Sequence, residues 1–365
     1  LSGAENAPTI AEISIQDDHL KVVLEIYVGD LKTFLDLIPE DFFEDQEVQL
    51  PPLETRLRRF SAEVLQVVTQ DGENLQAELQ FAEPRLRKER PSAFAGMMNP
   101  LTGRPVPGPP EDKRVLYAEV VYPFQTRPDS LTIGPPLGPR AAVSIGFIAY
   151  HKEVPIVDFR YLSEPSRVHL DWDDPWYSSF DQKSLKRWQQ SGVMVFLYIE
   201  PYEVRYEVLT RVKDVAAWLE IDLRGDEFIE ADEFVALKDQ IGEFFLHNAN
   251  VRIDGQELRP ILDRPSFVKY TMTRTYFIEQ PERLPLATAM VGVIITYLTD
   301  GIPQEVTAEW TLFTDRIQRV PTNAIDPAGP FPSYVTPEDN VLTWSNYLNT
   351  YTIPTVEKVT VPETL

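Results

Sequence analysis

Residues 221–234, IDLRGDEFIEADEF, have the side-chain types and the spacing of a calcium-binding loop. In an EF-hand loop, oxygen ligands come from the first and last positions and from carboxylates between them. Here Asp222 would stand at the first position and Glu233 at the last, and Asp226 and Glu230 offer further oxygens. The segment therefore has the outline of a Ca²⁺ site.

Two residues inside the same loop oppose the ion. Arg224 places a positive charge at the third position, where a carboxylate should coordinate. Glu227 occupies the sixth position, where the sharp turn requires glycine. We therefore expect no cofactor, and we predict that the loop is a structural element with the shape of an EF-hand. Calcium binding through the remaining oxygens of Asp226 and Glu230 is the alternative.

A second candidate site is the segment HLDWDDPWYSSFD, residues 169–181, which concentrates aromatic and acidic side chains. Aromatic faces beside carboxylates are how a sugar platform or a cation site is built. An alternative reading places Trp172 in the core and makes Asp173-Asp174-Pro175 a turn. The candidate ligand-binding residues are His169, Asp171, Asp173, Asp174 and Trp176.

Other catalytic chemistry has little support in the sequence. The chain has no cysteine and only four histidines, His19, His151, His169 and His247, none of them paired at i+2 or i+4. Phosphate-binding glycine loops and the G-x-S-x-G motif are absent. A hydrolase that uses a carboxylate pair stays open as an alternative, although 57 acidic residues make such pairs common by chance.

These candidate sites have to be positioned by a chain that we predict to be duplicated. Short patterns recur in the same order: Leu24-Glu-Ile26 and Leu197-Tyr-Ile199, VTQDGENLQ (68–76) and VRIDGQELR (251–259), YPFQTRPDSLT (122–132) and YLTDGIPQEVT (297–307), and FIAYHKEVP (147–155) and FTDRIQRVP (313–321). Repetition of several patterns at a similar offset indicates two homologous domains.

The elements of each copy are predominantly strands. Segments such as AEVLQVVT, VLYAEVVYPF and EVTAEWTLF alternate apolar and polar residues and end at Pro, Gly, Asn or Asp, which is typical of a β-sandwich. One polar face per strand favours antiparallel sheets. We predict a mainly β chain of two tandem homologous antiparallel β-sandwich domains, the second with an inserted EF-hand-like helical pair.

The first domain is expected at residues 1–190 and the second at residues 191–365, with a short polar helix at 181–192 before the boundary. The helical pair is expected as a helix-loop-helix at 203–246. Its first helix would carry Val204, Val208, Val212, Val215 and Leu219 on one face, and its second Phe234, Leu237, Ile241 and Phe244.

A long Pro/Gly-rich loop at residues 90–114 distinguishes the first copy. Loops of this length are usually functional or disordered. Its apolar residues Phe94, Met97, Met98 and Leu101 are the candidate partner-binding residues. The alternative is that they fold back over the first sandwich.

Charge and composition narrow the partners. A formal net charge of -23 repels phosphate backbones and anionic lipids, so no nucleic acid is expected. The basic runs RLRR (56–59) and RLRKER (85–90) are interpreted as solvated strand ends. The first residue is Leu1 rather than Met, from which we expect a removed secretory signal and a periplasmic or extracellular location. No apolar run reaches the roughly 20 residues of a membrane-spanning helix.

The second copy carries a family resemblance. An alternating strand, an acidic-capped helix, the EF-hand-like pair and a strand ending in Asp254-Gly255 resemble the extracytoplasmic domain of bacterial HupE/UreJ-type and related membrane proteins. The resemblance covers mainly residues 193–313. It implies a periplasmic location and a membrane anchor supplied by segments outside this chain or by a partner, and it carries over no catalytic residue.

The sequence therefore predicts a non-enzymatic, extracytoplasmic structural or accessory subunit of an envelope assembly. Its expected partners are other protein subunits, including further copies of itself in a homo-oligomer. The alternatives are a carbohydrate- or cation-binding module that uses residues 169–181, and the carboxylate-pair hydrolase.

Overall fold

The structure, a computed structural model, describes residues 3–40, 50–90, 92, 94–100, 102–187, 190–221, 227–270 and 275–347. The chain is mainly β and divides into two compact units, Leu1–Gln190 and Ser191–Leu365. Each unit has its own hydrophobic core, to which strands of a large and a small sheet both contribute. In the described ranges, no helix has the length and apolar character needed to cross a membrane.

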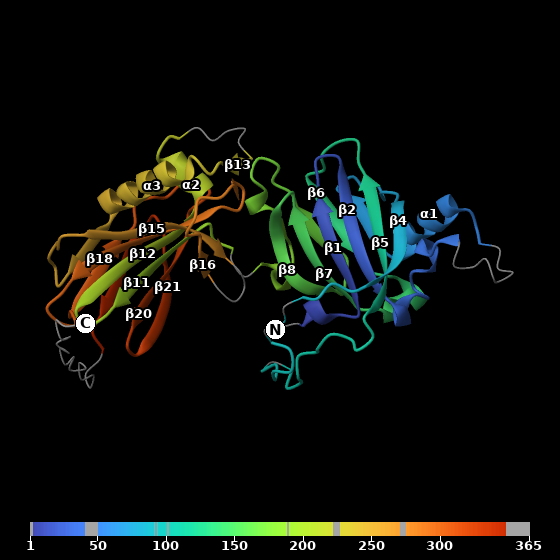
Figure 1. The fold of residues 1–365 in the computed structure, drawn as a ribbon, viewed down its shortest axis with the longest axis horizontal. Coiled ribbons are helices and arrows are strands. Elements are labelled where there is room, and N and C mark those ends of the chain that lie inside the picture. Colours follow the sequence, from blue (N-terminus) through green and yellow to red (C-terminus); the bar gives the residue numbers. More distant parts are fainter. Residues whose placement is uncertain are drawn as a thin grey trace, which may run out of the picture. The chain divides into compact units, whose positions relative to one another are not determined.

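The first unit contains a six-stranded sheet in the order β4-β5-β2-β1-β7-β8 (Figure 1). It also contains a four-stranded sheet in the order β10-β9-β6-β3. Its helix α1 spans Leu53–Glu63, and short 3-10 turns occupy Ala4–Asn6, Val28–Asp30, Leu35–Leu37, Gly138–Ala142, Pro175–Tyr177 and Lys183–Leu185. The strands are β1 (Thr9–Ile15), β2 (His19–Tyr27), β3 (Gln66–Thr69), β4 (Glu78–Leu86), β5 (Arg114–Pro123), β6 (Ser130–Gly134), β7 (Ile145–His151), β8 (Val154–Leu162), β9 (Ser166–His169) and β10 (Ser179–Phe180).

The second unit contains a seven-stranded sheet in the order β16-β15-β18-β12-β11-β20-β21, a three-stranded sheet β14-β19-β22 and the pair β13-β17. Its helices are α2 (Val212–Trp218) and α3 (Phe234–Asn248). The strands are β11 (Val193–Ile199), β12 (Glu203–Arg211), β13 (Phe228–Ile229), β14 (Asn250–Ile253), β15 (Ile261–Tyr270), β16 (Thr275–Phe277), β17 (Leu284–Pro285), β18 (Met290–Leu298), β19 (Glu305–Glu309), β20 (Val320–Asp326), β21 (Gly329–Val335) and β22 (Val341–Ser345).

The two units share an order of strands. The series β4-β5-β2-β1-β7-β8 in the first large sheet corresponds to β15-β18-β12-β11-β20-β21 in the second, and β9-β6-β3 corresponds to β22-β19-β14. Both large sheets contain one parallel pair, β1 with β7 and β11 with β20, among antiparallel neighbours. The large sheets are therefore mixed, which corrects the expectation of purely antiparallel sheets. Common descent of the two units stays a prediction.

This strand order agrees with some of the sequence matches and shifts others. Tyr122 and Tyr297 lie near the ends of the equivalent strands β5 and β18, in agreement with their match. Leu24 lies in β2, however, and its match Leu197 lies in β11, which corresponds to β1. Short alternating segments resemble one another in any strand. These matches therefore indicate that a repeat is present, but they do not always pair the strands that are equivalent in the two units.

The predicted helix-loop-helix at 203–246 is wrong in its first half. Residues Glu203–Arg211 form strand β12 between β11 and β18, and Val204, Tyr206 and Val208 are buried at the two-residue period of a strand. Only Val212–Trp218 is helical. The second helix is confirmed as α3, which buries Phe234, Leu237 and Ile241, but its fourth predicted core residue, Phe244, is only partly buried and Phe245 lies in the core instead. Before the domain boundary, the described residues show only the 3-10 turn Lys183–Leu185 instead of the expected polar helix.

The basic runs are only partly the solvated strand ends that were expected: Arg58 and Arg85 are exposed, whereas Arg56 and Arg90 are not. Arg56, in α1, is 2% exposed and donates to the carbonyl oxygen of Ile38 at 2.8 Å. Arg90 donates to Glu25 Oε2 at 2.6 Å and to Glu12 Oε1 at 2.8 Å. Since the side chains of Arg90 and Glu25 are only 7% and 9% exposed, this pair lies largely out of water. Arg90 therefore neutralises a buried carboxylate in this strongly acidic chain.

We predict that Arg90→Ala lowers the free energy of unfolding by about 3 kcal/mol, because it leaves the buried Glu25 carboxylate without its cation. Arg58→Ala, which removes an exposed i,i+4 pair with Glu54, should cost less than about 0.5 kcal/mol. Urea unfolding of both variants at neutral pH measures the difference. Equal losses would contradict the assignment of Arg90 as a buried counter-ion.

Candidate functional site

The acidic residues of the 169–181 segment hold their own turn together. Asp171 Oδ1 accepts the backbone N–H of Asp173 at 3.1 Å and of Asp174 at 2.8 Å. Asp174 in turn caps the 3-10 turn Pro175–Tyr177 by accepting Trp176 N–H at 3.3 Å. Carboxylates of this kind satisfy local backbone donors, as Asp does in Asx turns.

The aromatic and histidine members of the same segment do not form an open platform. Trp176 is 7% exposed, and the guanidinium carbon of Arg187 lies 3.8 Å from the centroid of its ring. His169 Nε2 lies 2.8 Å from Asp181 Oδ1 in an exposed pair. The structure therefore places four of the five candidate ligand residues in one turn, directly after His169 at the end of β9, and Asp171, Asp174 and Trp176 have structural roles there.

Beside this turn the structure forms a buried Ser–His pair that the sequence did not indicate. His151, at the end of β7, is 0% exposed, and its Nδ1 lies 2.7 Å from Ser178 Oγ. Ser178 Oγ also accepts Asp171 N–H at 2.9 Å, and the His151 ring meets Trp172 edge-on at 4.4 Å. Two residues that are 27 positions apart carry no local spacing signal.

The environment of His151 keeps its imidazole neutral. Burial lowers the pKa of His151 to about 4, and the charge of Lys152 and, more weakly, of Arg127 acts in the same direction. Asp17 and Asp171 oppose the shift. A neutral imidazole next to a hydroxyl resembles part of a nucleophilic dyad, but Ser178 Oγ is buried and also accepts the backbone N–H of Asp171, so it is held in the structure of the turn. We therefore interpret the pair as part of the core.

This pair generates a pH prediction. The unfolded chain takes up a proton at His151 near pH 6.5, whereas the folded chain resists it down to about pH 4. The contribution is therefore fully present above about pH 6.5 and is lost as the pH falls to about 4, by up to about 3 kcal/mol. Urea unfolding across this window should show a shallower pH dependence for His151→Gln than for the wild type. Identical slopes would contradict the prediction.

The candidate calcium ligands are only partly described. Asp222, Asp226 and the opposing Arg224 lie outside the described residues. Glu230 Oε1 accepts Arg283 Nε at 2.9 Å, and Glu233 Oε2 accepts Glu230 N–H at 3.1 Å. Within the described ranges, no group of three or more acidic, histidine or cysteine side chains could hold a metal ion.

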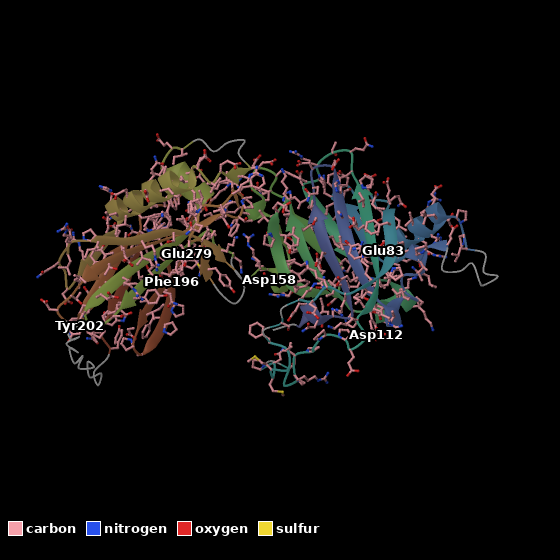
Figure 2. All side chains as sticks on the ribbon, viewed as in Figure 1. Glu83, Asp112, Asp158, Phe196, Tyr202 and Glu279 are labelled. Carbon is pink, nitrogen blue, oxygen red and sulfur yellow. The ribbon has the colours of Figure 1, made fainter. Side chains whose placement is uncertain are left out.

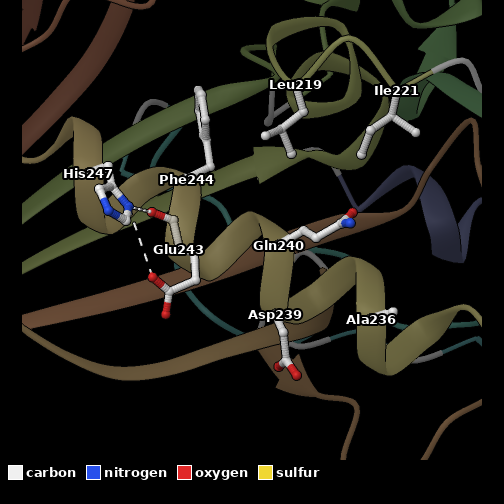
Figure 3. Close-up of a pocket in the computed structure, with 8 residues that line it drawn as sticks. All are labelled: Leu219, Ile221, Ala236, Asp239, Gln240, Glu243, Phe244 and His247. Carbon is white, nitrogen blue, oxygen red and sulfur yellow. Dashed lines mark hydrogen bonds and ion pairs between the residues drawn. The ribbon is translucent and has the colours of Figure 1, made fainter.

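An open groove runs along α3, with a volume of about 610 Å³. Figure 3 shows its apolar side chains, including Leu219 and Phe244, together with polar residues of α3 such as Glu243 and His247. The His247 ring donates from Nδ1 to the carbonyl oxygen of Glu243 at 2.7 Å.

The outer face of the seven-stranded sheet carries an aromatic pair. Phe196, labelled in Figure 2, and Tyr198 both project from β11, and their rings are 6.4 Å apart. Arg205 of β12 lies 4.9 Å from the Tyr198 ring. Burial raises the pKa of the neighbouring Glu207, and Asp263 adds to the shift. Phe196 and Tyr198 alternate along β11 with residues of the core. Their spacing in the sequence therefore indicates that they lie on the opposite face of the strand, but it does not indicate a binding site.

The 90–114 loop contains a small hairpin, residues 94–106, that stands on a buried base. Gly96 N donates to Val106 O at 2.9 Å, and Val106 N donates to Met97 O at 2.8 Å. Val106 is 3% exposed, whereas Met97 and Met98 are 53% and 62% exposed. Phe94 is half-buried, and Leu101 lies outside the described residues.

Contacts with the N-terminal segment hold the base of this hairpin. Asn6 Nδ2 donates to Ser92 Oγ at 2.8 Å and to Pro107 O at 2.9 Å. Ser92 Oγ donates to Glu5 Oε1 at 2.7 Å. Figure 1 shows the hairpin, in teal, extending beyond the strand ends of the six-stranded sheet. Its base is folded onto the first unit while its methionines face solvent.

Comparison of the chain with protein-family models found no match, and comparison with curated protein sequences found none either.

Proposed function

We propose that this protein is a non-enzymatic structural or accessory subunit of an extracytoplasmic assembly, and that the hairpin of residues 94–106 contacts another subunit. The observation that carries the proposal is the exposure of Met97 and Met98 on a hairpin whose base is buried. Functional residues are often carried on loops that a rigid scaffold positions. Methionine suits such a contact because its flexible, polarisable side chain adapts to a partner.

Energetics support a protein partner at this position. Complete burial of a methionine side chain contributes about 1.5 to 3 kcal/mol. Because Gly96, Met97 and Val106 are already joined by backbone hydrogen bonds, the hairpin loses little conformational entropy on binding. A neighbouring apolar residue, the half-buried Phe94, would enlarge the buried area.

The extracytoplasmic location rests on the resemblance to HupE/UreJ-type domains. Of the features that carry the resemblance, the alternating strand corresponds to β11 and the second helix of the expected pair corresponds to α3. The Asp254-Gly255 turn follows β14. The helix expected from Glu203 is instead strand β12. The membrane anchor would belong to other segments or to the partner subunit.

The test is to purify the protein from its native host in wild-type form and as the double variant Met97→Ser/Met98→Ser. We expect the wild type to co-purify with a stoichiometric partner and the variant to lose it while keeping its melting temperature, because these side chains are exposed. A partner that is a second copy would identify a homo-oligomer, which sedimentation of the isolated chain measures.

Leu86→Ser is the matched control, since Leu86 is a 72% exposed apolar residue in β4 of the same unit. It should retain the partner. A double variant that assembles like the wild type would contradict the proposal. Replacing all of residues 90–114 would be less informative, because that change also removes Arg90 and the buried Val106.

A further inference from the structure

The first unit closes the hairpin that begins with β3. Val67 in β3 stands opposite Ile133 in β6. On its other side, Val67 O accepts Leu75 N–H at 2.9 Å, so the returning chain pairs with β3 beyond the turn. The equivalent position in the second unit is Val251 in β14, which stands opposite Ala308 in β19.

The second unit leaves the same hairpin open. Its Asp254-Gly255 turn is closed by reciprocal backbone bonds between Ile253 and Gln256, at 2.9 and 3.0 Å. Beyond the turn, no hydrogen bond joins Leu258 N to Val251 O, although both residues lie in the described part of the chain. The arms therefore separate where their counterparts in the first unit are paired.

A buried tyrosine lies at the bottom of this opening. In the first unit, Tyr122 OH donates to Leu65 O at 2.7 Å. Tyr297 occupies the equivalent place in β18 and is 1% exposed, yet its hydroxyl has no hydrogen-bond partner among the described atoms. Burial raises the pKa of Tyr297 to about 12, so the hydroxyl keeps its proton and remains a donor. A buried donor without an acceptor is costly unless something else fills the site.

Two differences in sequence explain the opening. Leu65, which is 0% exposed, corresponds to Ala249, whose smaller side chain fills less of the space. Ala77, whose N–H donates to Ser61 Oγ at 2.8 Å, corresponds to Pro260, which has no N–H to donate. The returning arm of the second hairpin therefore loses a backbone anchor that the first one has.

The opening is a cleft of about 390 Å³ whose lining includes Tyr297, Asn250, Arg252, Glu257, Thr307 and Glu309. This volume equals that of about a dozen water molecules and falls in the usual range of small-molecule sites. Arg252 Nη2 is paired with Glu257 Oε1 at 2.8 Å. Glu309 Oε1 accepts from Asn340 Nδ2 at 3.1 Å, but no ion pair to Glu309 is present among the described residues.

We propose that this cleft binds a hexose-sized polyhydroxylated molecule, such as a sugar unit of a glycan. Hydroxyl groups both donate and accept, so they can accept from Tyr297 OH and donate to the carboxylates of Glu257 and Glu309. The excess negative charge disfavours anions. An extended peptide does not fit as an added strand, because the arms rejoin at Ile253 and Gln256. The proposal is independent of the methionine hairpin.

The test is a titration of the full chain with the methyl α-glycosides of glucose, galactose and mannose, followed by amide NMR. We expect at least one of them to give saturable shifts at the amides of Ala249 and Leu258, with a dissociation constant in the millimolar range. Tyr297→Phe should weaken that binding at least about fivefold, the effect of losing one hydrogen bond. Its melting temperature should stay close to that of the wild type, since the hydroxyl bonds to no described atom.

Tyr122→Phe is the matched control in the first unit, where the hydroxyl is occupied by Leu65 O. It should lower the melting temperature and leave sugar affinity unchanged. The proposal is overturned if none of the three glycosides shifts these amides, if the shifts map to residues away from the cleft, or if Tyr297→Phe binds as tightly as the wild type.

Discussion

Each large sheet in this protein has to bury one face while its other face meets polar surroundings, and most of the remaining structure follows from that constraint. Along β11, the side chains of Val193, Val195, Leu197 and Ile199 enter the core, and the residues between them lie on the opposite face. A small sheet and a helix then cover the apolar side, as α3 does where it packs against β15 and β18. Polar groups that are buried near the strand ends need hydrogen-bond partners. Tyr122 OH, near the end of β5, has one in Leu65 O, whereas Tyr297 OH, near the end of β18, has none among the described atoms.

The same constraint explains where the charges are placed. With 34 basic residues against 57 acidic ones, a carboxylate that faces the inside of a loop or sheet needs one of a limited set of cations. Asp36, which is 0% exposed, receives Arg140 at 2.7 Å and also binds Arg59. Removal of a buried cation leaves its carboxylate as an uncompensated buried charge. We therefore interpret these arginines as stabilising the structure rather than binding an external ligand.

Local pattern in the sequence was sufficient for the fold class and for α3, and it failed where two periods fit the same residues. Val204, Val208 and Val212 are spaced as on a helix, but Val204, Tyr206 and Val208 are spaced as on a strand. Residues 203–211 form a strand because they pair with β11 on one side and with β18 on the other. β18 is distant in sequence, so a local pattern does not show this pairing. The interpretation of Arg56 and Arg90 as solvated residues was wrong for a related reason. The sequence does not show which carboxylate or carbonyl group lies close to these arginines in the fold.

The segment 169–181, which was a candidate site because its polar and aromatic residues are close in sequence, does not form an open ligand site, for a physical reason. Acidic residues that are close in sequence reach each other's backbone first, as Asp171 and Asp174 do, so their oxygens are used in building the turn. A site open to a ligand needs polar groups that the fold brings together and then leaves unsatisfied. Such groups come from distant segments, and the comparison of two similar units reveals them more readily than motif spacing does. Tyr122 and Tyr297 are the same residue type at matching places in matching strands, and only the surroundings of one hydroxyl differ. Selection for stability alone would favour closing the second hairpin as the first is closed, so the open cleft is the feature of this fold that calls for a functional explanation.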